Sequence, residues 1–328
     1  MAGLITVCRK ELADHFGSKR YLILFALLLL LSTVSAYQGS EFIRDNPDAG
    51  FLSIFSGAQF SFSFVQLMVY FGPIVGLSLG FDAINKERTS GTLSVLLSQP
   101  IFRDSVINGK FLAGALALAI MTGSTIGIMC GVVIPILGFG PTMEEALSII
   151  SLSSLTILYL ALWLSLGVLF SVVTKKVSTS TLASVATWLF CAIMIPILAV
   201  FIANQMVPLP IDIRGPDGFN QGPGGFNQTS FTQLSEYQTL MQERSVLQST
   251  ISKLSPSYLY SDVASSILGA AGMGTTFSMG QGGRFRAPTL TQSVTASWPS
   301  VAAIAVGLVV CFTVSYMMFI RSEVRPGG

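Results

Sequence analysis

The sequence predicts an all-α integral membrane protein with six transmembrane helices, for two reasons. First, hydrophobic residues make up 51% of the 328 residues and charged residues only 10%, with a mean hydropathy of +0.69. Soluble domains carry about 25% charged residues, so this composition is typical of a membrane protein. Second, six separate segments are long and apolar enough to cross a bilayer as helices, and none of them contains Asp, Glu, Lys or Arg.

The predicted spans are Tyr21–Tyr37, Phe62–Phe81, Phe111–Phe139, Ala146–Val173, Val177–Ala203 and Trp298–Ile320. A helix needs about 20 mostly apolar residues to cross a bilayer, and the third and fourth runs are long enough to tilt. The resulting organisation is an amphipathic lead over residues 1–20, spans one to five within 21–206, an extracytoplasmic loop over 207–297, span six at 298–320 and a tail over 321–328.

The charges of the short loops predict the orientation. On one side of the membrane the loops and termini carry Arg9, Lys10, Lys19, Arg20, Lys86, Arg88, Arg103, Lys110, Lys175, Lys176, Arg321 and Arg325. The opposite short loops hold Arg44 alone, beside several acidic residues. The positive-inside rule then places both termini in the cytoplasm, so we expect a multi-pass protein of the cell membrane.

The long loop before the last span predicts a small external helical cap. Its first part is rich in Pro and Gly and resists regular structure. Residues Phe231–Leu254 show a helical apolar stripe, and Ser257–Leu268 predicts a second short helix after the break at Pro256. An extracytoplasmic partner for this cap is possible. Asn227 begins a glycosylation sequon, although an unmodified loop is favoured unless the cell glycosylates exported proteins.

The residues needed for catalysis, metal binding or nucleic-acid binding do not occur together. His15 is the only histidine, the four cysteines are scattered, and no run rich in Lys or Arg is present. The stretch Asn108-Gly109-Lys110 lacks the upstream glycine and the following Ser or Thr of a phosphate-binding loop. We therefore expect a non-catalytic chain that has no cofactor, binds no nucleic acid and does not hydrolyse ATP by itself.

Two spans contain glycines at every fourth position. These residues are Gly72, Gly76 and Gly80 in the second span and Gly123, Gly127 and Gly131 in the third. Small residues at this spacing allow helix backbones to approach closely. They are consistent with a gated path or with ordinary packing within one subunit. Pro73, Pro135 and Pro196 could interrupt helices as in ion-coupled transporters, although simple kinks are the favoured interpretation.

A polar segment, Asp82–Lys110, separates the second and third spans. Thr89, Ser90 and Thr92 are capping residues, and Gly91 permits a bend. Leu93, Leu96 and Leu97 fall on one face of a helix, which Pro100 would end. We expect a short surface helix over residues 84–99. Its leucine face either binds another protein or lies in the lipid headgroups.

This segment resembles the region after the second span of ABC-2 type transporter permeases, closest to the branch that includes permeases of multicopper-enzyme maturation. The resemblance rests on Glu87-Arg88, Gly91-Thr92-Leu93, Leu96-Leu97, Ser98-Gln99-Pro100, Arg103 and Gly109-Lys110. It implies that residues 84–99 form a coupling helix docked on a separate ATPase subunit. The implied contact residues are Glu87, Arg88, Gly91, Thr92, Leu93, Leu96 and Leu97.

The resemblance further implies an exporter in which two ATPase copies hold the ATP and Mg²⁺. A second permease copy, identical or related, would complete the pathway in the lipid bilayer. The lead over residues 4–16 would be an elbow helix on the cytoplasmic surface. Two other functions remain open from the residues alone: a membrane anchor or assembly factor that binds a partner through its external cap, and a secondary transporter.

Overall fold

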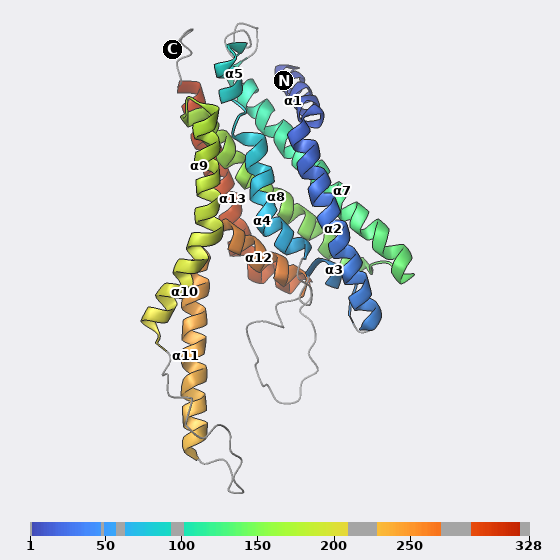
Figure 1. Cartoon of the computed structure of the whole chain (residues 1–328), viewed down its shortest axis with the longest axis vertical. Coiled ribbons are helices and arrows are strands. Elements are labelled where there is room, and N and C mark those ends of the chain that lie inside the picture. Colours follow the sequence, from blue (N-terminus) through green and yellow to red (C-terminus); the bar gives the residue numbers. More distant parts are fainter. Residues whose placement is uncertain are drawn as a thin grey trace. The chain divides into compact units, whose positions relative to one another are not determined.

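The computed structural model describes residues 2–46, 49–56, 63–92, 102–208, 228–269 and 290–321, and its regular elements there are all helices (Figure 1). Six described segments are long and apolar enough to cross a membrane. They are Lys19–Asp45, Phe64–Thr89, Arg103–Leu137, Met143–Val173, Val177–Met206 and Thr295–Arg321. The prediction of an all-α protein with six spans is therefore confirmed.

The helices are longer than the apolar runs that predicted them. Helix α2 (Lys19–Asp45) continues past Tyr37 because the polar side chains beyond it still bond within the helix, as Ser40 does to the Tyr37 carbonyl oxygen at 2.7 Å. Helix α7 (Arg103–Leu137) begins eight residues before Phe111. Helix α8 (Met143–Val173) begins at a capping box between Thr142 and Glu145.

The described chain forms two compact units, residues 1–188 with 259–328 and residues 189–258. In the first unit, helix α4 (Phe64–Gly80) packs closely along α8. A Cβ atom added at Gly80 would lie 2.6 Å from the Leu164 carbonyl oxygen, and one at Gly76 would lie 2.7 Å from that of Leu160. Glycine is therefore required at both positions for this approach of the two backbones.

Three other elements complete the helical core of this unit. Helix α13 (Leu290–Arg321) packs along α8. Helix α3 (Ser53–Ser56) buries Ile54 and Phe55. Helix α12 (Pro256–Ile267) inserts the fully buried Tyr260, whose ring stacks on Tyr159 at 4.4 Å between centroids.

The predicted second helix of the loop thus exists, and from Leu259 onward it belongs to the first unit. The Tyr260 hydroxyl lies 3.0 Å from Thr156 Oγ1 on α8, and Val263 and Ala264 are buried as well. The prediction of a cap tethered only by loops is incomplete for α12, because the apolar face of this helix is covered by the membrane helices. The first helix of the loop, α11 (Gln228–Ser252), belongs to the second unit.

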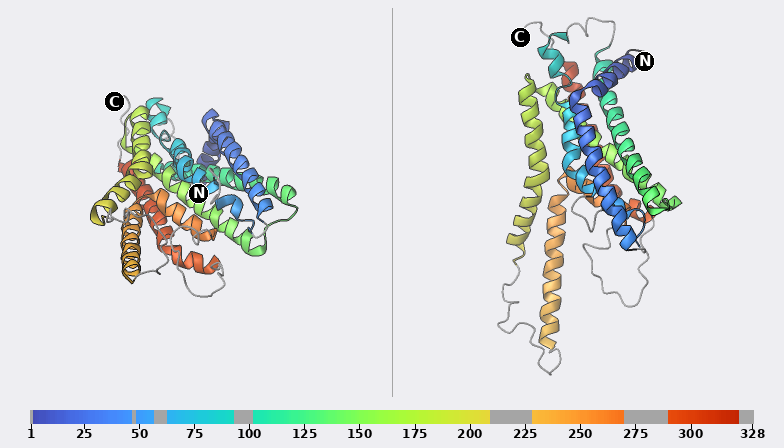
Figure 2. Two further views of the ribbon diagram at one scale, coloured as in Figure 1. Left: turned by 60° about the horizontal axis from the view of Figure 1, so that its bottom comes forward. Right: turned by 45° about the vertical axis from the view of Figure 1, so that its right-hand side comes forward.

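Helix α1 (Ala2–Gly17) lies at one end of the first unit, the same end at which α13 finishes (Figures 1 and 2). Ser18 separates α1 from α2 and caps the start of α2, because its Oγ accepts a hydrogen bond from the Tyr21 amide at 3.2 Å. Helix α1 packs on the start of α7, where Gly109 makes room for Val7; a Cβ at Gly109 would lie 2.8 Å from Val7 Cγ1.

The second unit contains the distal half of span five and α11. Helix α9 (Val177–Leu189) leads into a π-helix, η1 (Phe190–Met194), followed by α10 (Ile195–Met206). Pro196 stands in the first turn of α10, and its missing amide hydrogen explains why the α-helical bonding is interrupted before it. Pro73 and Pro135 lie inside uninterrupted helices, so of the three prolines only Pro196 accompanies a break.

Candidate functional site

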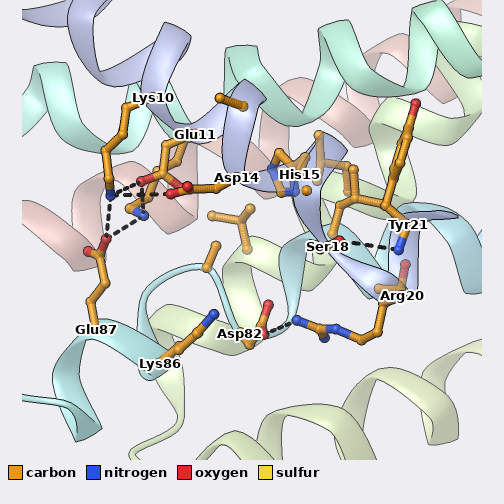
Figure 3. Close-up of a pocket in the computed structure, with 18 of the residues that line it drawn as sticks. Lys10, Glu11, Asp14, His15, Ser18, Arg20, Tyr21, Asp82, Lys86 and Glu87 are labelled. Carbon is orange, nitrogen blue, oxygen red and sulfur yellow. Dashed lines mark hydrogen bonds and ion pairs between the residues drawn. The ribbon is translucent and has the colours of Figure 1, made fainter.

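A cavity of about 800 Å³ lies at the α1 end of the first unit (Figure 3). Its walls come from α1, the α1–α2 turn, the end of α4, α5 (Asn85–Thr89) and the starts or ends of α7 and α8. Leu79, Leu164 and Val168 form an apolar part of the wall, whereas most of the remaining lining is charged or polar. The cavity therefore lies between α1 on one side and the end of α4 and α5 on the other, while α7 and α8 pack on each other at Leu164.

Lys110 is the most buried charged group of the cavity. Only 4% of its side chain is exposed, and its Nζ donates to Glu11 Oε1 at 2.9 Å and to Glu87 Oε1 at 2.8 Å. Each of these three residues comes from a different helix: Glu11 from α1, Glu87 from α5 and Lys110 from α7. A buried ammonium is tolerated only where carboxylates compensate its lost hydration, so the three residues stabilise one another.

Lys10 adds a second cation at the rim of this cluster (Figure 3). Its Nζ lies 3.1 Å from Glu11 Oε1, 3.5 Å from Asp14 Oδ2 and 4.0 Å from Glu87 Oε1. Burial alone would raise the pKa of Glu11, but the charges of Lys110 and Lys10 outweigh burial and lower it. For Lys10, burial opposes the charged form, yet the surrounding carboxylates raise its pKa. Both groups are thus held in their charged forms.

His15 lies on the same face of α1 and lines the cavity (Figure 3). Burial lowers its pKa, with Glu11, Asp14 and Asp82 acting against that shift and Lys110 reinforcing it. On the opposite wall, the Lys86 side chain points into the cavity (Figure 3).

Arg20 makes the remaining ion pair across the cavity. Its guanidinium donates to the Asp82 carboxylate in the turn between α4 and α5 (Figure 3). The same guanidinium lies 5.2 Å from the centroid of the Phe81 ring. Both contacts join the start of α2 to the end of α4.

Helix α5 is also attached to α8, and the turn before it to α8 and α9, by neutral hydrogen bonds. The amides of Ile84 and Asn85 donate to Ser171 Oγ at 2.9 and 3.0 Å, and Asn85 Nδ2 donates to Thr174 Oγ1 at 2.8 Å. The Ser180 hydroxyl donates to the Phe81 carbonyl oxygen at 2.7 Å. The beginning of the polar segment is therefore held from both sides.

The predicted contact residues divide into two groups. Glu87 and Arg88 are partly buried, Glu87 on the lysines and Arg88 donating to the Thr174 carbonyl oxygen at 3.4 Å. Gly91 and Thr92 are exposed, as are Thr89 and Ser90, and Gly91 adopts a φ of +73° that favours glycine. Leu93, Leu96 and Leu97 lie outside the described residues. The helix predicted over 84–99 is accordingly described only in part, with α5 ending at Thr89.

The two glycine triplets have different surroundings. A Cβ added at Gly72, Gly76 or Gly80 would contact α8 at 3.0 Å or less. At Gly123, Gly127 and Gly131 nothing lies within 4 Å of the added atom, so this triplet packs against no other described part of the chain. Asn227 lies outside the described residues.

The sequence assigned no role to Glu11, and Lys110 was used only as a loop charge for the orientation and as part of the family motif. One signal was available, because Lys110 directly precedes the apolar run that starts at Phe111, and Glu11 lies among the charges of the amphipathic lead. Ionisable groups next to a span are costly unless they are paired. Nothing in the sequence pattern indicates, however, which acid pairs with which base.

The six long apolar helices define a multi-pass membrane protein. The chain belongs to the ABC-2 family transporter proteins, whose family model matches residues 5–324. It is 28% identical over 205 residues to the probable ABC transporter permease protein NosY of Pseudomonas aeruginosa, covering 61% of this chain and 71% of that protein.

A second relative is the protein of the same name from Stutzerimonas stutzeri. The identity is 32% over 114 residues, covering 35% of this chain and 39% of that protein. Together with the family match and the six spans, these relatives support an ABC-2 transporter permease, which confirms the resemblance seen in the polar segment.

Proposed function

We propose that this permease is driven by a separate ATPase subunit that docks on residues 84–99. The observation that carries the proposal is the way the start of this segment is held. Glu87 is bound to Lys110, and Asn85 is bound to the end of α8, while Thr89, Ser90, Gly91 and Thr92 stay exposed. A force applied to the exposed part would reach the membrane helices through short, directed bonds.

In this proposal both termini and the charged cavity face the cytoplasm, where ATP is available. The loop charges support this orientation, since the side that carries α1, Lys86, Lys110 and Lys175 is rich in basic residues. The end of α13 lies at the same end of the first unit as α1, which agrees with an even number of spans (Figure 2). We further propose residence in the cell membrane.

Permease subunits of ABC transporters are generally non-catalytic, and we propose the same for this chain. ATP and Mg²⁺ would be bound by two copies of the ATPase, and two permease copies would form the pathway in the bilayer. We propose export as the direction of transport, in keeping with the resemblance of the polar segment to ABC-2 type permeases. Membership of this family favours a transporter over the anchor or secondary transporter that the residues alone leave open.

The proposal is tested by purifying the tagged chain from its own cells and measuring the ATPase that accompanies it. The Leu96→Glu variant places a charge on the expected leucine face and should lose both the bound ATPase and the ATP hydrolysis. Ser245→Glu, at an exposed position of α11, is the matched control and should keep both. A docking segment at 84–99 is ruled out if Leu96→Glu retains the wild-type amount and activity of the ATPase.

A further inference from the structure

We propose that Lys110 is a positioning residue that couples movement of α5 to the α1–α7 pair. The inference deepens the proposed function, on which it rests for the origin of the movement. The coupling itself is argued from the ion pairs and from the cavity around them.

The first argument is the place of Lys110 in the chain. Glu87 and Lys110 are 23 residues apart, Glu87 near the start of the proposed docking segment and Lys110 in α7 beyond its end, so their ion pair joins the start of that segment to α7. Helix α5 is also connected to α7 indirectly, because the Ile84 and Asn85 amides bond to α8 and α8 packs on α7 at Leu164. The Glu87–Lys110 pair adds a direct connection. With it, a displacement of α5 acts directly on α7.

Second, the single ammonium group of Lys110 contacts both α1 and α5. Lys110 Nζ binds Glu87 of α5 and Glu11 of α1 at nearly equal distances, 2.8 and 2.9 Å. The side chains of Glu11 and Glu87 are only 13% and 15% exposed. Because water reaches these carboxylates poorly, losing the cation would leave two acids close together with Lys10 alone to compensate them.

The third argument is the contrast between the two sides of α5. Toward α8 and α9 it is held by hydrogen bonds from its backbone and from Asn85. Toward α1 and α7 the cavity of about 800 Å³ intervenes, and ion pairs cross it. Helix α1 is packed tightly on α7 at Gly109, so these two helices move together. The ion pairs of Glu87 therefore join α5 directly to α1 and α7, and the Arg20–Asp82 pair adds a second link at the turn before α5.

The experiment measures the distance across this cavity in the complex with its ATPase, reconstituted in lipid nanodiscs. Spin labels at Arg9→Cys on α1 and Lys175→Cys at the end of α8 use exposed positions on the two sides, with the native cysteines replaced. Electron–electron distance distributions are compared between the nucleotide-free complex and the complex trapped with ADP and vanadate.

We expect trapping to shift the distribution in the parent complex. Lys110→Met should abolish that shift while ATP hydrolysis continues, and Lys110→Arg should restore it because the guanidinium can reach both acids. Lys19→Met is the matched control in the complex, since it removes an exposed lysine at the start of α2, outside residues 84–99, without breaking a described ion pair. Lys86→Met, which removes a lysine from the cavity itself, is the control in the isolated chain. A trapped-state shift that survives in Lys110→Met, or that is absent from the parent complex, overturns the coupling role.

The isolated chain separates this inference from the proposed function. Without any ATPase, Lys110→Met should broaden the distance distribution relative to the parent, whereas Lys110→Arg and Lys86→Met should not. If the ATPase fails to bind but this broadening is observed, the docking proposal fails, while the role of Lys110 in holding α5 to α1 and α7 is supported. If the isolated Lys110→Met chain has the same distance distribution as the parent, Lys110 does not hold α5 to α1 and α7, and this inference is wrong whether or not the ATPase binds.

Discussion

Lys110 Nζ lies 2.8 Å from Glu87 Oε1, although the two residues are 23 positions apart in the polar segment between spans two and three. The same nitrogen binds Glu11 of α1. Three helices thus meet at one buried cation, at the end of the permease where we place the ATPase. These ion pairs hold the start of the polar segment against α1 and α7.

Removing the buried cation should destabilise the permease. Breaking a buried ion pair by deleting one partner costs about 3–5 kcal/mol, and Glu11 and Glu87 would be left facing each other in Lys110→Met. Thermal unfolding of the purified variant in detergent should therefore shift clearly to lower temperature. Lys86→Met should stay within about 0.5 kcal/mol of the parent. Equal midpoints for the two variants contradict the described pairing.

The two glycine triplets should respond oppositely to alanine. Gly80→Ala forces a methyl group to 2.6 Å from the Leu164 carbonyl oxygen, and overpacking of this kind costs about 1–3 kcal/mol. Gly127→Ala meets open space and replaces a poor helix former, so its effect should be neutral or stabilising by up to about 1 kcal/mol. Unfolding midpoints in detergent compare the pair directly. A destabilising Gly127→Ala would show that this face is covered in the isolated protein.

Acidification should weaken the α1 end through His15. Its folded-state pKa is lowered by burial, so below its ordinary value of 6.5 the unfolded chain binds more protons than the folded chain and stability falls with pH. The parent should unfold at lower temperature at about pH 5.5 than at about pH 7.5, and His15→Gln should reduce this difference.

The acidic residues around His15 do not produce the same effect in that range. The pKa of Glu11 is lowered from 4.5, so its stabilising contribution is present above that value and is lost only as pH falls through the folded-state pKa. Glu11→Gln removes a charge that raises the His15 pKa, so it should keep or enlarge the difference between about pH 5.5 and about pH 7.5, unlike His15→Gln. An unchanged difference in His15→Gln means that His15 does not cause the pH dependence.

The proposed orientation predicts which cysteines an impermeant reagent reaches. In an otherwise cysteine-free chain, Thr89→Cys on α5 should react with a membrane-impermeant maleimide only after the cells are opened. Ser245→Cys on α11 should react while the cell membrane is still intact, once the reagent can pass any layer outside that membrane. Both positions are exposed, so accessibility within the protein does not bias the comparison. The reverse pattern would place both termini outside the cytoplasm.

The spans could be predicted because a membrane-crossing helix is recorded locally, as an apolar run of sufficient length. The runs did not predict where helices end: α2 continues eight residues past Tyr37 because Ser40 and its neighbours bond within the helix. The glycine spacing predicted close packing and was right for Gly76 and Gly80. The identical spacing at Gly123 and Gly127 meets no described neighbour, because spacing does not say which face a helix turns inward.

The charged cavity could not be predicted in the same way. Glu11, Glu87 and Lys110 are far apart in sequence, and only the packing of α1 on α7 and of α4 on α8 brings them together. The resemblance selected Glu87 as a docking residue. Its carboxylate binds lysines within the chain, which no sequence pattern indicated, while Ser90 and Thr92 nearby are exposed.

The central claim is that a separate ATPase drives this permease through residues 84–99. The most direct measurement is the ATPase activity that co-purifies with the tagged chain, compared between the parent, Leu96→Glu and Ser245→Glu. The account predicts activity with the parent and with Ser245→Glu, and its loss together with the ATPase subunit in Leu96→Glu. Wild-type binding and hydrolysis in Leu96→Glu would contradict it.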